Sequence, residues 1–324
     1  MEFFKTDRVY DFMGKAKLFL AISTILVVGS WALLAFKGLN FGIDFAGGTI
    51  VQVRYDKPVQ IKNIRETLKK SELFKDASVT YFGSDQEIII RLKTSSKKLG
   101  KDIGDEVRSV LKGTGNFEIR RVDMVGPKVG SELREKGLMA TIIALVAILL
   151  YVSFRFEWRF ALASVLALVH DASIAMGAIS LFNVPVNLDI LAAILTLLGY
   201  SLNDTIIVFD RIREGIMENT KLNDLNLVIN DSITKTLSRT TLTSLTTFFV
   251  VLTLYLFGGE IIRGFSFTLL VGIIVGTYSS IFIASPMLKI LGFDLQGYRQ
   301  RLAEKKKRQQ EKERMRAMYE QGMV

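Results

Sequence analysis

The sequence predicts a polytopic α-helical membrane protein with six transmembrane helices and one α+β ferredoxin-like domain outside the membrane, between helices 1 and 2. Apolar residues gather in six long runs, and a polar stretch, residues 38–136, separates the first run from the second. A run of about 20 apolar residues can cross the roughly 30 Å hydrocarbon core of a bilayer. Hydrophobic residues make up 49% of the chain and charged residues 23%, which is possible because the two kinds are segregated along the sequence.

Six segments have the length and apolarity of transmembrane helices. They are Lys17–Phe36, Leu138–Phe154, Phe160–Phe182, Leu188–Phe209, Thr240–Phe257 and Phe265–Leu291. The first is longer than the ~7–15-residue apolar core of a signal peptide, and no A-x-A-like cleavage site follows it. We therefore interpret it as an uncleaved transmembrane helix.

Basic residues predict the orientation of these helices. They precede the first helix and fill the connections after the second and the fourth, at Lys5, Arg8, Lys15, Lys17, Arg155, Arg159, Arg211, Arg213 and Lys221. The positive-inside rule then places both termini in the cytoplasm, and it places segments 182–187, 258–264 and 38–136 on the outer side. We expect four parts: 1–37, cytoplasmic N-terminus and helix 1; 38–136, periplasmic domain; 137–291, helices 2–6; 292–324, basic cytoplasmic tail.

The net charge of +10 does not by itself predict a nucleic-acid partner, and none is expected. Much of it lies in the tail and in the loops that set topology. The tail segment RQRLAEKKKRQQEKERMR is interpreted as a solvated topogenic face. Binding of anionic lipid or of ribosomal RNA by the tail remains an alternative.

Composition also limits the chemistry. The chain has no cysteine and one histidine, so disulfides, thiolate metal sites and multi-histidine zinc sites are excluded. We expect no cofactor, no metal ion and no enzymatic activity.

Residues 38–136 alternate between strand and helix periods. The predicted elements are a strand at 49–55, a helix at 60–70, strands at 77–82 and 87–92 joined by a turn at 83–86, a helix at 97–112 and a strand at 116–125. This β-α-β-β-α-β order is that of a ferredoxin-like fold. The segment has no His, no Cys and no phosphate-binding loop, so we expect it to contact an exported substrate or a partner protein.

Ionisable residues inside transmembrane segments indicate function. In the third predicted helix, His170 and Asp171 lie near the middle, and Asp171 continues a stripe of alanines four residues apart that predicts contact with other helices. In the fourth, Asn203 and Asp204 interrupt an apolar run. Asp204 ends a stripe with the same spacing that consists of Ala192, Thr196, Tyr200 and Asp204.

The fifth predicted helix begins within TLSRTTLTSLTTF and carries two polar rows, Arg239–Thr243–Thr247 and Thr236–Thr240–Ser244. The sixth has small residues four apart at Gly272, Gly276, Ser280 and Ala284. We take Asp204 and Arg239 as the candidate proton-coupling pair. Supporting polar candidates are Asn203, Asp171, His170, Tyr200, Thr240 and Thr243.

The candidate pair suggests proton coupling. Burial favours the protonated form of a carboxylic acid, whereas a nearby guanidinium favours the ionised form. A movement that brings Asp204 toward Arg239 or away from it would release or load a proton, with Arg239 as the fixed cation. The alternative is a static ion pair that pins helices together. Against it, a central Asp or Arg costs roughly 2.5–3.5 kcal/mol, and an interhelical hydrogen bond recovers only about 0.6 kcal/mol.

Several long motifs occur in one order along the chain. They are FGIDFAGG (41–48), VGPKVGSEL (125–133), FRFEWRFA (154–161), the His-Asp pair of helix 3, GYSLNDTIIVFDRIRE (199–214), TLSRTTLTS (236–244) and FGG…GFS…GTYSSIFIASP. In these motifs the chain resembles the SecF family, whose members are subunits of the bacterial SecDF protein-export complex of the resistance-nodulation-division superfamily.

The resemblance implies a six-helix half that SecD completes. It implies that the complex uses the proton motive force to help move preproteins outward across the inner membrane, after the step driven by SecA and SecYEG. It also implies that the key acid lies in the NDT motif, at Asp204, and the key arginine in the SRT motif, at Arg239. Independently, six helices with one outer domain make half of a pseudo-symmetric transporter, so a second half is expected.

Two other functions remain open. One is a self-contained, proton-driven exporter of small amphipathic molecules. The other is an intramembrane aspartyl protease that uses Asp171 and Asp204, whose carboxylates would have to share a proton about 3 Å apart. Their predicted depths match imperfectly, and no Gly-x-Gly-Asp motif is present. Sodium also remains open as the coupling ion, because a carboxylate with hydroxyl neighbours can bind either ion.

Overall fold

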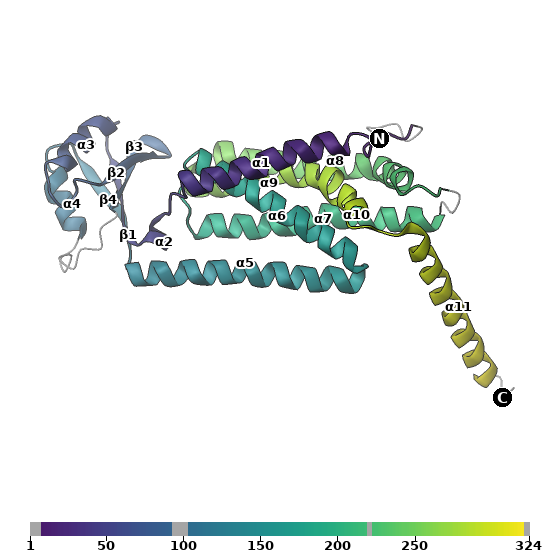
Figure 1. Cartoon of the computed structure of the whole chain (residues 1–324). Coiled ribbons are helices and arrows are strands. Elements are labelled where there is room, and N and C mark those ends of the chain that lie inside the picture. Colours follow the sequence, from purple (N-terminus) through teal and green to yellow (C-terminus); the bar gives the residue numbers. More distant parts are fainter. Residues whose placement is uncertain (1–7, 93–102, 219–221, 321–324) are drawn as a thin grey trace.

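The computed structural model describes residues 8–92, 103–218 and 222–320. Figure 1 shows a small sheet domain at one end of a long helical bundle. Among the described residues, six helices are long and apolar enough to cross a membrane, so the predicted number of spans is confirmed. The spans are α1 (Ala16–Phe36), α5 (Pro127–Arg155), α6 (Trp158–Leu181), α7 (Leu188–Glu218), α8 (Leu225–Phe257) and the run of α9 (Gly259–Ser279), η1 (Ser280–Ala284) and α10 (Ser285–Ile290).

Three spans are longer than predicted by more than two turns. Helix α5 begins at Pro127 rather than at Leu138, and α7 continues past Phe209. The prediction that the fifth span begins within residues 236–248 is wrong, because α8 begins at Leu225, where Asp224 accepts a hydrogen bond from the backbone N–H of Asn226. In each case the added turns mix polar and apolar residues. The continuous apolar run therefore predicted the part of the helix suited to lipid but not the full length of the helix.

The sheet domain has the predicted ferredoxin-like topology. Its elements are β1 (Gly48–Tyr55), α3 (Ile61–Lys69), β2 (Ser78–Phe82), β3 (Ser84–Leu92), α4 (Ile103–Leu111) and β4 (Phe117–Val125). All pairings are antiparallel, in the order β2-β3-β1-β4. Alternate strand residues and one face of each helix form its core, at Val51, Val53, Ile64, Leu68, Val79, Ile88, Ile90, Val107 and Leu111.

Two details of the sheet domain differ from the prediction. The turn between β2 and β3 is shorter than 83–86, since Phe82 already pairs with Ser84. Gly83 makes this tight turn possible with a φ of 74°, which a residue without a Cβ adopts readily. Helix α4 begins at Ile103 in the described chain, and residues 97–102 of the predicted helix lie outside the described residues.

A glycine pair joins the sheet domain to the bundle. The short helix α2 (Ile43–Ala46) ends at Gly47, and Gly48 opens β1 with a φ of 137°. A Cβ on Gly48 would collide with the carbonyl oxygen of Leu92 in β3. One on Gly47 would lie 2.9 Å from Cα of Pro127, the first residue of α5. The backbones of β1, β3 and α5 therefore approach one another too closely for any side chain here.

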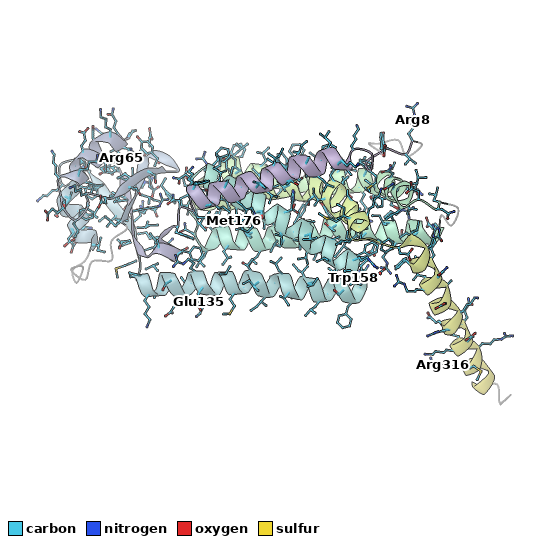
Figure 2. All side chains as sticks on the ribbon, viewed as in Figure 1. Arg8, Arg65, Glu135, Trp158, Met176 and Arg316 are labelled. Carbon is cyan, nitrogen blue, oxygen red and sulfur yellow. The ribbon has the colours of Figure 1, made fainter. Side chains whose placement is uncertain are left out.

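Small residues set the helix packing of the bundle. The predicted stripe of α6 is fully buried, at Ala163, Ala167, Asp171 and Ala175. On α9, a Cβ on Gly276 would lie 3.0 Å from Cβ of Ser201, so glycine lets α9 pack closely on α7. In contrast, α1 and α5 expose rows of large apolar side chains, as expected for faces turned to lipid. Figure 2 shows Glu135 standing away from the bundle on α5.

The last helix, α11 (Leu295–Glu320), runs obliquely away from the end of the bundle opposite the sheet domain (Figure 1). Its first turns are held by Arg299, which donates to the carbonyl oxygens of Ile216 and Leu222, and by Arg301, which pairs with Glu157 at 3.1 Å. Arg316 stands out from its far part (Figure 2). The N-terminal end of α1 lies at this same end of the bundle.

The glycine junction predicts a stability defect. Gly48→Ala imposes a left-handed φ on a residue with a Cβ and a collision with backbone, so it should lower the free energy of unfolding by roughly 1–3 kcal/mol. Thermal unfolding of the purified full chain in detergent measures this. Gly29→Ala on α1 is the matched control, because its added Cβ meets nothing within 4 Å. Equal melting temperatures for the two variants would contradict the account of the junction.

Candidate functional site

Asp204 lies inside the bundle, where α7, α8 and α9 meet. Its side chain is 1% exposed. Its Oδ2 accepts a hydrogen bond from Ser244 of α8 at 3.2 Å. The hydroxyl of Thr277 of α9 has one hydrogen, which lies within reach of three acceptors: Oδ2 of Asp204 at 3.5 Å, Oγ of Ser244 at 2.8 Å and the carbonyl oxygen of Ile273 at 2.8 Å. The carboxyl is thus held by two hydroxyls from two different helices.

The other oxygen of Asp204, Oδ1, is buried without a hydrogen-bond partner among the described residues. The hydroxyl oxygens of Tyr200, Thr205 and Thr240 are also buried and unpartnered in that part of the chain. Tyr200 and Asp204 are one turn apart on α7 and therefore share a face. Buried polar atoms are rarely left unpaired in folded proteins. The surroundings of Asp204 are therefore polar and incomplete, as expected where a small ion exchanges.

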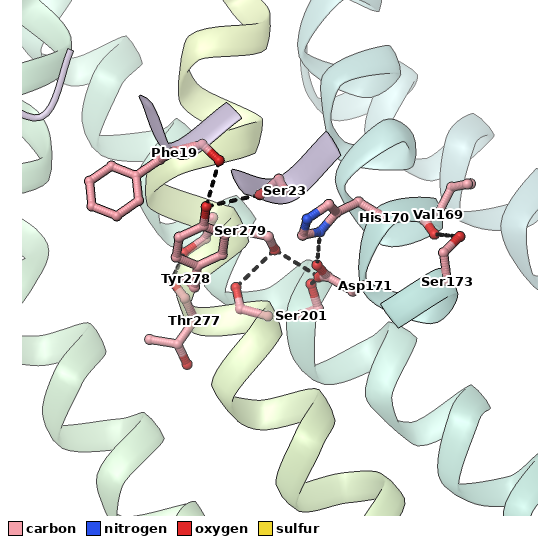
Figure 3. A network of polar contacts seen from close by, with 12 residues as sticks. Phe19, Ser23, Val169, His170, Asp171, Ser173, Ser201, Thr277, Tyr278 and Ser279 are labelled. Carbon is pink, nitrogen blue, oxygen red and sulfur yellow. Dashed lines mark hydrogen bonds and ion pairs between the residues drawn. The ribbon is translucent and has the colours of Figure 1, made fainter. Parts of the chain in front are cut away.

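Asp171 is the centre of a second polar network, shown in Figure 3. It is fully buried. Its Oδ2 accepts hydrogen bonds from Ser201 of α7 and from Ser279 of α9, at 2.5 and 2.7 Å, and its Oδ1 lies 2.7 Å from Nδ1 of His170. On the α1 side, the hydroxyl of Tyr278 lies 2.9 Å from that of Ser23 and donates to the carbonyl oxygen of Phe19.

The two carboxyl groups cross-link the same pair of helices. On α7, Ser201 contacts Asp171 and precedes Asp204 by less than one turn. On α9, Thr277 contacts Asp204 and Ser279 contacts Asp171. A displacement of α9 along α7 would therefore change the hydroxyl contacts of both acids together.

Arg239 is on a different face from Asp204. Its side chain is exposed on α8 and makes no hydrogen bond or ion pair within the described part of the chain. The row Thr236–Thr240–Ser244 is buried, whereas Arg239 and Thr243 in the neighbouring row are exposed. Asn203 is exposed on α7. The structure thus brings Asp204, Thr240 and Ser244 into the bundle interior and leaves Arg239, Thr243 and Asn203 on its surface.

The predicted stripe on α7 is only partly inside the bundle. Ala192 and Thr196 are exposed, Tyr200 is half-buried and Asp204 is buried. Four-residue steps advance about 400° around a helix, so such a stripe drifts slowly around the axis. Over these four positions that drift carries the stripe from the bundle surface into its interior.

The geometry for an aspartyl protease is not formed. The carboxyl groups of Asp171 and Asp204 bind different hydroxyls, and no hydrogen bond joins them in the described residues. They therefore do not share a proton as that chemistry requires. Within residues 8–92, 103–218 and 222–320, no group of three or more His, Asp or Glu side chains is placed to hold a metal ion.

Sequence reasoning missed three hydroxyls of these networks: Ser201, Thr277 and Ser279. Ser and Thr are common in apolar helices, where they bond to their own backbone, so single occurrences carry little signal. The signal was the local density of hydroxyls in Thr277–Ser280, a polar run within an otherwise apolar span.

A cavity of about 680 Å³ separates the sheet domain from the adjoining end of the bundle. Polar and charged residues line it on both sides, at Thr80, Tyr81, Arg91, Asn183, Asp189, Glu260 and Arg263, and the bundle side adds apolar residues such as Phe182, Val184, Ile261 and Phe267. Burial lowers the pKa of the Arg91 guanidinium from its ordinary value, and the charge of Glu260 opposes this change. The sheet domain therefore meets the bundle through polar groups, with space between them.

Fold and site define a class, a multi-pass membrane transport protein with buried acids among its spans and a ferredoxin-like domain at one end. The sequence matches the family described as "Protein export membrane protein SecD/SecF, C-terminal" over residues 106–294 and "SecD/SecF GG Motif" over residues 32–59. The chain belongs to the SecD/SecF family.

Relatives and solved structures agree with this assignment. The chain is 51% identical over 324 residues, all of both sequences, to the "Protein translocase subunit SecF" of Helicobacter pylori strain J99. It is 40% identical to that of Escherichia coli O157:H7 over 92% of this chain and 93% of the relative. The crystal structure of SecDF, a translocon-associated membrane protein from Thermus thermophilus, matches with a TM-score of 0.78 and 36% identity. That match covers 88% of this chain but 39% of the SecDF chain.

The hydroxyl contacts of Asp204 predict a measurable contribution to stability. Thr277→Val keeps the shape of the side chain and removes its hydrogen bonds to Ser244 and Asp204, so it should lower the free energy of unfolding by about 1 kcal/mol. Thr253→Val is the control, since Thr253 is exposed and bonds only to its own helix, at Phe249. Unfolding of the full chain in mixed micelles compares them. A control variant as unstable as Thr277→Val would show that the contacts around Asp204 contribute nothing particular.

Proposed function

We propose that the chain is an auxiliary subunit of the Sec protein translocase in the bacterial inner membrane. It forms a complex with SecD, acts with SecYEG and SecA, and uses the proton motive force to assist late export of preproteins. The observation that carries the proposal is 51% identity over the full length of a relative named as a translocase subunit. The similarity to solved SecDF structures supports the partner, because this chain matches about 39% of such a chain.

The proton-coupling part of the proposal is supported by the surroundings of Asp204. A carboxylate in an apolar bundle is costly unless it is fully hydrogen-bonded. Asp204 has two hydroxyl contacts at one oxygen and an unpartnered second oxygen in the described chain. Taking up a proton removes the charge, so the energy of this side chain depends on its protonation and on the positions of α8 and α9.

The role of Arg239 in the proposal involves the partner. A guanidinium on the surface of a transmembrane helix is costly in lipid, and such residues face protein or water. Arg239 and Thr243 of α8 and Asn203 of α7 are exposed at this depth. We therefore place SecD against this polar face of α7 and α8, where Arg239 supplies the fixed positive charge for the cycle.

The arrangement of the ends supports the proposed orientation. The N-terminal end of α1 and the start of α11 lie at one end of the bundle, and the sheet domain lies at the other (Figure 1). Basic residues concentrate at the end that carries α11, including Arg155, Arg213 and Arg299. By the positive-inside rule this end is cytoplasmic, and the sheet domain is then periplasmic.

Asp204→Asn tests the carrier role. The variant should insert and assemble normally but lose export stimulation that depends on the proton gradient, because an amide of the same shape cannot carry a proton. The measurement is preprotein translocation into vesicles that contain the complex, with and without an imposed gradient. Asp210→Asn is the control on the same helix, since Asp210 forms a partly exposed ion pair with Arg155 at 2.7 Å. Gradient-dependent export by Asp204→Asn at the wild-type rate would assign the carrier to another residue.

Arg239→Lys tests the requirement for a guanidinium. Lysine keeps the charge but not the planar fork that binds a carboxylate through two parallel hydrogen bonds. We expect at least a several-fold loss of gradient-dependent export, measured in the same vesicles. Arg314→Lys on the exposed part of α11 should have no effect. Wild-type export by Arg239→Lys would mean that charge alone is needed at this position.

A further inference from the structure

His170 has the features of a proton-binding group that the proposed function leaves unused. It is the only histidine of the chain and is 8% exposed within α6. Nδ1 lies 2.7 Å from Asp171, but Nε2 is buried and has no hydrogen-bond partner in the described part of the chain. A buried polar atom without a partner costs about 1–3 kcal/mol. Packing alone therefore does not account for an imidazole at this position.

The contacts of Asp171 fix the arrangement of the pair. Its Oδ2 accepts hydrogen bonds from the hydroxyls of Ser201 and Ser279. Nδ1 of His170 lies 2.7 Å from Oδ1. Because an ionised carboxylate only accepts hydrogen bonds, we assign the hydrogen to Nδ1. Three donors stabilise an ionised carboxylate. A neutral imidazole that donates from Nδ1 carries its lone pair on Nε2. The pair then has one net negative charge inside an apolar bundle.

We infer that His170 and Asp171 form a second proton-binding site of this chain. Nε2 of His170 takes a proton from water, and the imidazolium–carboxylate pair that results has no net charge. Uptake removes net charge from the bundle interior, and the adjacent carboxylate stabilises the cation. Release returns the proton to water, so the step needs no other reactant.

Few other ionisable groups face this pair. Helix α6 packs against α1, α5, α7 and α9. On α9, the ring of Tyr278 stacks on His170 with centroids 6.3 Å apart. On α7, the nearest acid is Asp204, beyond Ser201. Residues 19–36 of α1 and 138–154 of α5 contain no acidic or basic residue. Other charged residues of α6, α9 and α10 lie toward the helix ends, at Arg159, Glu260, Arg263 and Lys289.

The second site is mechanically coupled to Asp204. Ser201 and Ser279, which bind Asp171, belong to the same two helices as Asp204 and its partner Thr277. The π-helical turn η1 begins directly after Ser279. Such wide turns lie often at functional sites, where helix geometry is locally irregular. A shift of α9 against α7 that accompanies protonation at one site must therefore alter the hydroxyl contacts at the other.

The coupling rests on the proposed function of Asp204, but the existence of the site does not. Histidine protonation can be measured directly, without transport. The probe is the full chain in lipid nanodiscs, labelled with ring-¹⁵N histidine and purified with a histidine-free tag, because its ¹⁵N ring signals then come from His170 alone. The experiment follows both ring nitrogens as the pH is varied from about 9 to about 5.

In the wild-type chain we expect a protonated Nδ1 and an unprotonated Nε2 at high pH, and both nitrogens protonated at low pH. Asp171→Asn should change how the ring signals respond to pH and so displace the midpoint, because it removes the adjacent charge. A wild-type imidazole that keeps one state over the whole range, or that carries its hydrogen on Nε2 at high pH, overturns the inference. This outcome needs no variant, so a misfolded Asp171→Asn does not leave the question open.

Asp204→Asn tests the coupling in the same spectra. It should displace the midpoint of His170, whereas Asp210→Asn should not, because Asp210 pairs with Arg155 near the end of α7 and has no contact with these hydroxyls. Equal midpoints in the two variants overturn the coupling. Failure of the proposed function would be seen elsewhere, as gradient-dependent export by Asp204→Asn, so the two failures are distinguishable.

Discussion

The bundle buries two carboxyl groups, Asp171 and Asp204, and its helix contacts are built around them. An ionised carboxylate in apolar surroundings costs several kcal/mol unless donors surround it. Asp171 meets this requirement with two serines and a histidine. Asp204 meets it only in part, with hydroxyls at one oxygen and an unpartnered second oxygen among the described residues. Asp171 is thus fully hydrogen-bonded, whereas Asp204 is not. A change in the charge of Asp204 therefore disturbs fewer hydrogen bonds than a change in the charge of Asp171.

Helix α9 connects these two acids, and its sequence explains how. Gly272 and Gly276 have no side chain, so α7 packs closely enough for hydroxyls on α9 to reach both carboxyl groups. The hydroxyls follow at once, at Thr277 and Ser279, and the π-helical turn η1 comes next. Close packing, hydrogen bonding and an irregular turn therefore occupy one short segment. A movement of this segment would therefore change the hydrogen bonds of both acids.

The sequence predicted those features that follow from the periodicity of residue types. It did not predict features that depend on contacts with another helix. Small residues every four positions placed Asp171 in the interior, because a stripe that narrow serves only close helix contact. Strand alternation gave the ferredoxin-like order of the sheet domain for the same reason. The ends of α5, α7 and α8 were missed because each helix continues beyond its continuous apolar run into turns that mix polar and apolar residues. Residue spacing could not decide whether Asp204 contacts Arg239. Thr240 and Arg239 are neighbours in sequence but lie about 100° apart around α8. The row of Thr240 faces the bundle interior, and the row of Arg239 is exposed.

That separation has a physical consequence for the isolated chain. A guanidinium exposed to lipid is costly, and Arg239, at the edge of the apolar part of α8, finds no partner in the described residues to offset that cost. Asn203 is likewise exposed on α7, whereas the hydroxyl of Thr243 is satisfied by backbone carbonyl oxygens of its own helix. The apolar faces of α1 and α5 carry no such cost. The exposed faces of α1 and α5 are therefore suited to lipid, whereas the surface of α7 and α8 that carries Arg239 and Asn203 is not. A second membrane subunit against α7 and α8 would remove this cost.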